Sequence, residues 1–168
     1  MKLLSQTGIV SENTIKKEKG GIVNPFEMGM AGAKVFASKS MRKNLVTTLT
    51  EKNVPISEYK NIAHDRRLQL GVAFVPSKQV VNTHGHIGIF FPNKLLALRG
   101  AVVQPELIAQ GFSGEIWVTV NVTAPCYVED GTLLGEILFI KEEGSTEFMT
   151  KRLPTNAEFQ DGKFPQIA

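Results

Sequence analysis

The sequence predicts a mainly β protein with one compact core. Apolar residues alternate or form short buried runs in four segments, at 68–75, 86–91, 115–123 and 136–141, which is typical of strands. Fifteen Gly and eight Pro are spread between these runs and favour many turns. A length of 168 residues suits a single domain, 1–168, able to bury a sizeable core.

The strand expected at 115–123 has the clearest pattern. Ile116, Val118 and neighbouring valines fall on one face, while Glu115, Trp117 and Thr119 fall on the other. This alternation is typical of a half-buried antiparallel strand. We therefore expect Trp117 to point away from the core of its own chain and to meet another subunit.

Turn residues separate the expected strands. The turns are predicted at 75–78, 91–93, 104–106, 124–125 and 129–131. One amphipathic helix is predicted at 40–53, because Met41, Leu45 and Leu49 recur every four residues and Pro55 follows the segment.

The two ends of the chain differ from this body. Residues 1–30 form an N-terminal arm in which Pro25 favours extended chain, and the polar tail at 150–168 is expected to wrap over a neighbouring surface. The start turns polar after two leucines, so we expect neither a secretory signal nor a membrane span, and a location in the cytoplasm or in a virion.

The charge pattern, the histidines and the single cysteine argue against nucleic-acid binding, a metal site and a reactive thiol. The 19 basic residues are set against 16 acidic ones without a long run of one sign, which makes nucleic-acid binding unlikely. His84 and His86 could share one strand face, but no third ligand joins them with persuasive spacing, so no metal site is expected and their role stays open. Cys126 is the only cysteine and is predicted to be a buried, unreactive thiol.

Four segments recur in order along the chain, at 30–37, 92–100, 107–116 and 131–139, and the first reads Met30-Ala-Gly-Ala-Lys34-Val-Phe-Ala37. Together they resemble the motifs of the dCTP deaminase and dUTPase superfamily. The first stands where that family has Ala-Gly-Tyr-Asp-Leu, with Lys34 at the Asp position. The resemblance implies a distorted, jelly-roll-like β-barrel with one or two short helices. It also implies a homotrimer, because members of this family build their sites between subunits.

The second motif of the family is Pro-Arg-Ser-Ser followed by Leu-Ala-Leu-Lys-Gly, whose Arg and Ser grip phosphate. This chain has Pro92-Asn93-Lys94-Leu95 followed by Leu-Ala-Leu-Arg99-Gly. Asn93 and Leu95 therefore replace two phosphate ligands, and Leu95 has no hydroxyl donor. Lys94 and Arg99 are the residues that could still meet a phosphate.

The third motif is Leu-Ile-Asp and then Gly-Tyr-x-Gly-Glu-Ile in the family, where the Asp positions water or a sugar hydroxyl and the ring stacks on deoxyribose. Here the segment 107–116 reproduces the turn with Ala109 at the Asp position, and a methyl group cannot act as a base. Gly111 and Phe112 are kept as candidate contacts to a sugar or base. Thr119 stands where deaminases carry their catalytic Glu.

In the fourth motif, Gly-x-x-Ile-x-Gln-Leu-x-Phe, the chain has Glu136 in place of Gln, and this carboxylate would repel a triphosphate. We therefore expect a non-catalytic homotrimer without cofactor, reused as a structural or partner-binding module that binds another protein through its arms. A virion decoration or cement protein is one form of such a module. One alternative is a protein that senses or sequesters a pyrimidine deoxynucleotide. Another is an active dUTP diphosphatase or dCTP deaminase that uses Asp65 or Glu136 with magnesium.

Overall fold

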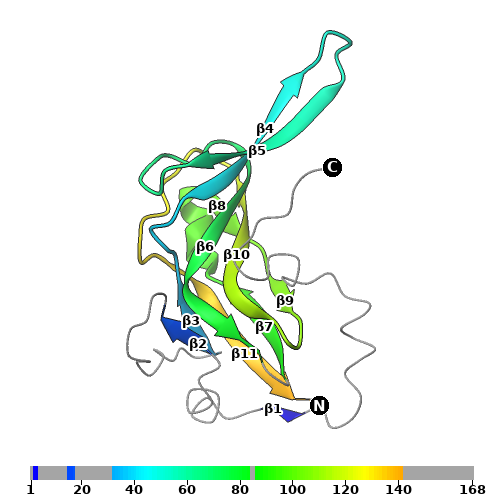
Figure 1. Ribbon diagram of the computed structural model, residues 1–168. Coiled ribbons are helices and arrows are strands. Elements are labelled where there is room, and N and C mark those ends of the chain that lie inside the picture. Colours follow the sequence, from blue (N-terminus) through cyan, green and yellow to red (C-terminus); the bar gives the residue numbers. More distant parts are fainter. Residues whose placement is uncertain (1, 4–14, 18–31, 84–85, 142–168) are drawn as a thin grey trace.

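The computed structural model describes residues 2–3, 15–17, 32–83 and 86–141 (Figure 1). Its strands are β1 (Lys2–Leu3), β2 (Ile15–Lys17), β3 (Ala33–Phe36), β4 (Arg42–Leu49), β5 (Pro55–Ile62), β6 (Gly71–Asn82), β7 (Ile87–Pro92), β8 (Ala101–Val103), β9 (Glu106–Ile108), β10 (Ser113–Val122) and β11 (Leu133–Lys141). The helix in this part of the chain is the short 3-10 helix η1 (Lys94–Arg99). The mainly β class is confirmed.

Two antiparallel sheets form the body. The first has the order β1-β11-β7-β9, with β3 also pairing with β11. The second has the order β5-β4-β6-β10-β8, with β2 also pairing with β6. The predicted strands at 86–91, 115–123 and 136–141 match β7, β10 and part of β11, whereas the one at 68–75 begins three residues later and is longer.

Buried apolar side chains from both sheets make one core. Fully buried members come from the first sheet, such as Val35, Phe90 and Ile137, and from the second, such as Val75 and Val118. In antiparallel strands alternate side chains point to opposite faces, so each sheet turns one set of residues toward the other sheet. Because both sheets contribute to this core, their packing determines where the connecting turns lie.

The turn predicted at 75–78 is wrong, because β6 runs straight through Pro76. Proline cannot donate to a sheet ladder, and the opposite strand accommodates it with an irregularity between Glu115 and Trp117. The Ile116 N–H there is accepted by the Ser77 Oγ at 2.9 Å. A bulge and one hydroxyl thus keep a central proline inside the strand.

The helix predicted at 40–53 is also wrong. Residues 42–49 form β4, which pairs with β5 along its whole length, and a turn with Asn53 at a φ of 57° joins them. A spacing of four residues is even, so it puts side chains on one face of a strand as well as of a helix. The β-branched run Val46-Thr47-Thr48 decides for the strand.

Trp117 does not project from its own chain as expected. It is 7% exposed, and both of its neighbours on β10 are buried as well. The bulge beside Trp117 interrupts the strict alternation of the strand, so residues on both sides of it turn inward. The tryptophan therefore lends no support to a subunit interface.

The described parts of the N-terminal arm lie along sheet edges, since β1 pairs with β11 and β2 pairs with β6. The C-terminal tail at 150–168 lies outside the described residues, as does His84. Within the described ranges, no helix has both the length and the apolar character needed to cross a membrane.

Candidate functional site

Strand β7 separates the two motif turns on which a nucleotide site would depend. Its last residue leads into Asn93 and η1, while its first residues pair with β9, just before Ala109. Gly88 lies opposite Ile108 in this ladder. The second-motif and third-motif turns therefore emerge from opposite ends of one strand.

At the second-motif turn, Asn93 is used to hold the chain together. Its Oδ1 accepts the Leu95 N–H at 3.2 Å and caps η1, and its Nδ2 donates to the Leu133 O at 3.0 Å. The Asn93 backbone N–H also donates to the Leu134 O at 2.8 Å. Both ends of the side-chain amide are thus engaged in joining η1 to β11, where the family has a phosphate ligand.

A hollow of about 340 Å³ lies beside this turn. It is lined by Asn93, Leu95, Leu96, Arg99, Thr132 and Leu133. Arg99 brings a cation to the hollow, and Lys94 lies exposed on the same helix. Leu95 is 70% exposed and Leu98 is 86% exposed, so the helix presents apolar side chains beside these two charges.

At the third-motif turn, hydrogen bonds and burial occupy the candidate residues. Thr83 Oγ1 donates to the Ala109 O at 2.8 Å and accepts the Phe112 N–H at 3.0 Å. Phe112 is 1% exposed and belongs to the core. Gly111 has a φ of 81° and open space where a side chain would begin. The ring expected to stack on a sugar is instead a core residue.

Thr119 lies on β10 beside a carboxylate that belongs to none of the four motifs. Glu106 Oε1 accepts the Thr119 N–H at 3.0 Å, and Glu106 belongs to β9. In the sequence, Glu106 follows Pro105 and reads as part of a turn, so its side chain gives no signal there. It is the carboxylate that the structure brings to the position matching the catalytic Glu of deaminases.

Lys34 and Glu136 face each other across two strands. They are direct partners in the β3–β11 ladder, and both are partly buried. Opposite charges at directly opposed positions attract. The two replacements relative to the family, a cation for an Asp and a carboxylate for a Gln, therefore complement each other within one chain.

The candidate residues do not all converge within one chain. Lys34, Glu136 and Asn93 gather around β11 and the end of β7, because β11 pairs with both β3 and β7. Ala109 follows the residue paired with Gly88, six positions from Asn93 along the direction of β7. At about 3.3 Å per residue this is roughly 20 Å, which is too far for one nucleotide pocket in a single chain.

A second hollow, of about 520 Å³, borders the turn that precedes β11. It is lined by His64, Asp65, Tyr127, Glu129 and Asp130. Behind it, the fully buried Arg42 donates to the His64 O at 2.8 Å and to the Ser38 O at 3.4 Å. Burial lowers the pKa of Arg42, and the charge of Asp130 opposes that shift. Asp65 thus shares a hollow with Asp130, the residue before Gly131 of the fourth motif.

The described residues contain no group of three or more His, Cys, Asp or Glu side chains that could hold a metal ion. His86, whose role the sequence leaves open, is buried at 6% exposure, with its Nδ1 3.1 Å from the Thr83 O. Cys126 is a buried free cysteine, as expected. Cys126 forms an isolated antiparallel β-bridge with Leu68.

The chain has a solved structural counterpart. The 2′-deoxycytidine 5′-triphosphate deaminase from Agrobacterium tumefaciens superposes with a TM-score of 0.53 at 13% sequence identity, over 82% of this chain and 47% of that one. This chain thus spans about half the length of that enzyme. No family model and no curated protein matches the sequence. At this identity the likeness establishes the fold, so the protein has a dUTPase-like β fold of the kind found in dCTP deaminase.

Proposed function

We propose that this protein is a non-catalytic homotrimer that uses the dUTPase-like fold as a structural or partner-binding module. The observation that carries the proposal is the role of Asn93, whose side-chain amide is committed at both ends to the backbone of η1 and β11. A phosphate ligand needs donors aimed at solvent. At the position where the family grips phosphate, this chain has a residue that builds the fold.

The remaining matching positions support the same proposal. The side chain of Ala109 is a methyl group. Lys34 lies directly opposite Glu136 in the β3–β11 ladder, so its positive charge faces a carboxylate of its own chain. Thr119 cannot take up and deliver a proton at neutral pH as a Glu does. The side chains of Ala109, Lys34 and Thr119 therefore supply no carboxylate at these three positions.

The trimer is proposed from the resemblance and from the spacing along β7. The second-motif and third-motif turns of one chain are roughly 20 Å apart, so a shared boundary would have to combine turns from two copies. The full chain is then expected to sediment at roughly 55 kDa, three copies of an 18.4 kDa chain. Sedimentation of a mass close to 18.4 kDa at all concentrations would overturn this part of the proposal.

One form of such a module is a virion decoration or cement protein that binds its partner through the two arms. Deleting residues 150–168 should abolish the binding of purified protein to particles of its virus while leaving the mass of the assembly unchanged. Electron microscopy that finds the protein absent from such particles would exclude this form and leave the partner-binding module to be sought in the cell.

A second candidate function is a pyrimidine deoxynucleotide sensor, which the hollow beside Arg99 favours. Calorimetry with dUTP, dCTP and dTTP separates the two candidates. The proposed module shows no heat of binding, whereas micromolar binding that disappears in Arg99→Ala and persists in Arg66→Ala would establish the sensor. Arg66 is an exposed arginine outside that hollow and serves as the matched control.

Catalysis is tested directly with the same nucleotides and magnesium. We expect neither pyrophosphate nor ammonia to be released by the purified full chain. Turnover that is lost in Glu136→Ala or Asp65→Ala, but kept in the exposed-site control Glu58→Ala, would overturn the proposal and establish an enzyme with relocated acids. Glu106→Ala belongs in the same panel, because this carboxylate contacts Thr119.

A further inference from the structure

Two hollows of opposite charge lie on either side of one tight turn. The turn comprises residues 129–132, where the Thr132 N–H donates to the Glu129 O at 3.1 Å and Gly131 has a φ of 77°. Thr132 lines the hollow of about 340 Å³ beside η1, and Glu129 lines the hollow of about 520 Å³. The two hollows therefore share this turn as a wall. We call the first one the basic hollow and the second one the acidic hollow.

Hydrogen bonds to the end of β3 hold the turn in place. The Gly131 N–H donates to the Ala37 O at 2.8 Å, and the Ala37 N–H donates to the Thr132 O at 2.8 Å. Asp130 lines the acidic hollow and Thr132 lines the basic one. Two residues of chain span about 7 Å at most. A partner that fills one hollow therefore lies beside the other.

The basic hollow combines a positive charge with exposed apolar surface. Arg99 lines it, and the described residues that line it include no carboxylate. Leu95 lines it too at 70% exposure, and Leu98 follows at 86% exposure. Residues three apart in a 3-10 helix lie directly above one another, so these two leucines form one stripe. The rim of this hollow thus presents a guanidinium and two isobutyl groups.

The acidic hollow has the complementary character. Three carboxylates line it, those of Asp65, Glu129 and Asp130. Tyr127, at 54% exposure, brings an aromatic ring to the same hollow. Carboxylates accept paired hydrogen bonds from a guanidinium, and the face of an aromatic ring attracts the same cation. This hollow therefore has the chemistry that receives an arginine.

The charges select a second copy of this chain as the partner. Two basic hollows face to face would bring Arg99 against Arg99, and two acidic hollows would bring carboxylates against carboxylates. Only a basic hollow against an acidic one places unlike charges together. Because the hollows share a wall, this contact also brings the acidic hollow of the first copy to the basic hollow of the second. Such reciprocal contacts are those of a twofold axis, here passing through the turn.

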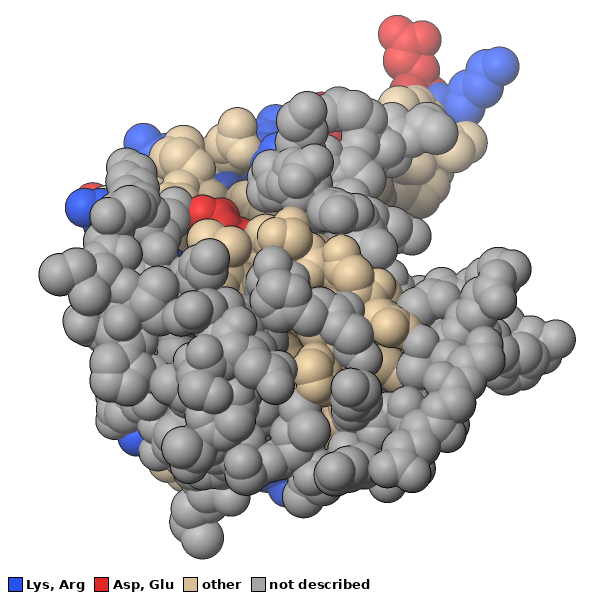
Figure 2. Space-filling view, turned by 60° about the horizontal axis from the view of Figure 1, so that its bottom comes forward, with Lys and Arg blue, Asp and Glu red and all other residues tan. Residues whose placement is uncertain are grey.

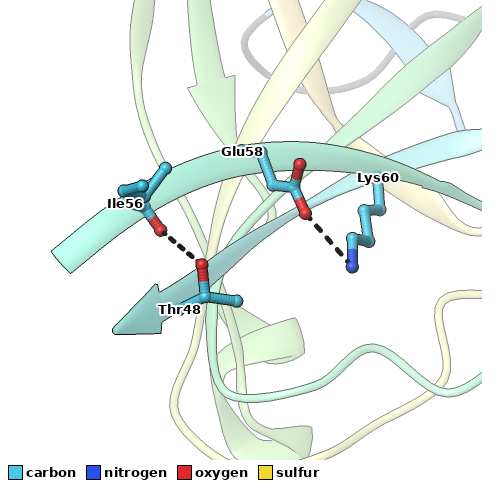
Figure 3. Close-up of polar contacts among 4 residues, drawn as sticks. All are labelled: Thr48, Ile56, Glu58 and Lys60. Atoms are coloured by element: carbon cyan, nitrogen blue, oxygen red, sulfur yellow. Dashed lines mark hydrogen bonds and ion pairs between the residues drawn. The ribbon is translucent and has the colours of Figure 1, made fainter. Parts of the chain in front are cut away.

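The charges of the hairpin β4–β5 are arranged differently. The hairpin projects from one end of the body (Figure 1), and acidic and basic residues lie side by side at its end (Figure 2). Glu58 and Lys60 form an ion pair at 3.1 Å, and Thr48 Oγ1 donates to the Ile56 O at 3.4 Å (Figure 3). These groups interact within the hairpin and line neither hollow. The hairpin therefore supplies control positions.

We propose that two copies of this chain pair across a twofold axis through the turn 129–132, with Arg99 of each copy held among the carboxylates of the other copy's acidic hollow. The leucine stripe of one copy then meets the Tyr127 ring of the other. Gly131 has open space where a side chain would begin, so the two turns can approach closely. The contact goes beyond the proposed trimer, because it joins two chains whatever assembly each belongs to. In a trimer it would join one trimer to another.

The test is the mass of the full chain in sedimentation over a range of concentrations. With rising concentration the wild type is expected to reach twice the mass of Arg99→Glu or of Glu129→Arg. Each of these variants places like charges opposite each other, so it should associate at least roughly tenfold more weakly. Asp130 is left intact because its charge acts on the fully buried Arg42.

Charge exchange separates this contact from a general loss of structure. An equimolar mixture of Arg99→Glu and Glu129→Arg restores unlike charges in both halves of the contact and should recover the doubled mass. A chain that carries both substitutions should recover it alone. Glu58→Arg makes the same kind of change on the hairpin and should keep the doubled mass. Circular dichroism confirms that each variant is folded.

A second pair of variants tests the apolar part of the contact. Leu98→Ser should weaken the association several-fold, whereas Leu49→Ser on the hairpin should leave it unchanged. Both leucines are strongly exposed in one chain, at 86% and 71%, so the two substitutions differ in place and not in burial.

The masses also keep this contact apart from the proposed trimer. Equal masses for the wild type and Arg99→Glu at every concentration, or no recovery in the mixture, would overturn the twofold contact. The mass of Arg99→Glu itself reports on the trimer. Three copies support the trimer, whereas one copy would overturn the trimer and leave a doubled wild type as evidence for the twofold contact.

Discussion

Two parts of the same sheet are held together in different ways. In the β6–β10 pair, Val75 and Val118 are fully buried, and the Pro76 irregularity is closed by Ser77. In the β4–β5 pair, exposure rises along β4, from the fully buried Arg42 to Leu49 at 71%. The β6–β10 pair depends on burial against the first sheet, whereas the β4–β5 hairpin depends on pairing between its own two strands. Substitutions in the β6–β10 pair should therefore lower the stability of the fold more than substitutions at the exposed end of the hairpin.

The largest effect is expected for Phe112→Ala in the body. Removing a fully buried ring leaves a cavity, and such changes cost about 3–5 kcal/mol of unfolding free energy. Chemical denaturation measures the loss, with Phe91→Ala as the control, because Phe91 is 41% exposed. If Phe112→Ala instead left the stability intact and abolished nucleotide binding, Phe112 would be a ligand contact.

The next largest effect is expected for Asn93→Ala, which removes the cap of η1 and the bond to Leu133. Losing such a cap costs about 1–2 kcal/mol. Asn93→Asp keeps an acceptor for the Leu95 N–H but loses the donor to the Leu133 O. The stability of this variant should therefore fall between that of the wild type and that of Asn93→Ala. Equal stability of Asn93→Ala and the wild type would contradict the structural role of this amide.

These two residues also show how far the sequence predicts the site. The third-motif turn predicted within 107–116 lies between β9 and β10, because Gly residues specify local backbone geometry. The second motif, at 92–100, contains the helix η1. The motif pattern does not reveal that Asn93 bonds to β11 or that Phe112 lies in the core, since both depend on strands distant in sequence. The contact between the Glu106 carboxylate and Thr119 is not predicted from the sequence for the same reason.

The prediction of the fold is likewise correct where the local pattern is strong and wrong where pairing with a distant strand decides. The strands with strong alternation are predicted within a few residues, as β7 and β10 are. The hairpin is mistaken for a helix because Met41, Leu45 and Leu49 satisfy both periods, and local pattern cannot say that β5 will pair with this segment. Pro76 reads as a turn because the bulge that tolerates it lies on another strand.

A smaller effect is expected from the thiol of Cys126. Burial raises its pKa above the ordinary value of 9.0, and the nearby Arg67 opposes the shift. The folded state therefore favours the neutral thiol, so this contribution to stability is complete below about pH 9 and is lost as the pH rises through the folded pKa. Denaturation curves at pH 7.5 and pH 10 should show a steeper decline for the wild type than for Cys126→Ala. Identical declines would contradict the pKa shift.

The smallest effect is expected for Leu49→Ala at the end of β4, and it tests the comparison most directly. Leu49 is 71% exposed, whereas Leu134 is fully buried, so the same substitution removes the same atoms from opposite environments. Leu134→Ala should cost about 2–5 kcal/mol, and Leu49→Ala should change the unfolding free energy by less than about 0.5 kcal/mol. A loss above 1 kcal/mol in Leu49→Ala would mean that the end of the ribbon is covered in solution, and the hairpin would then belong to the folded body.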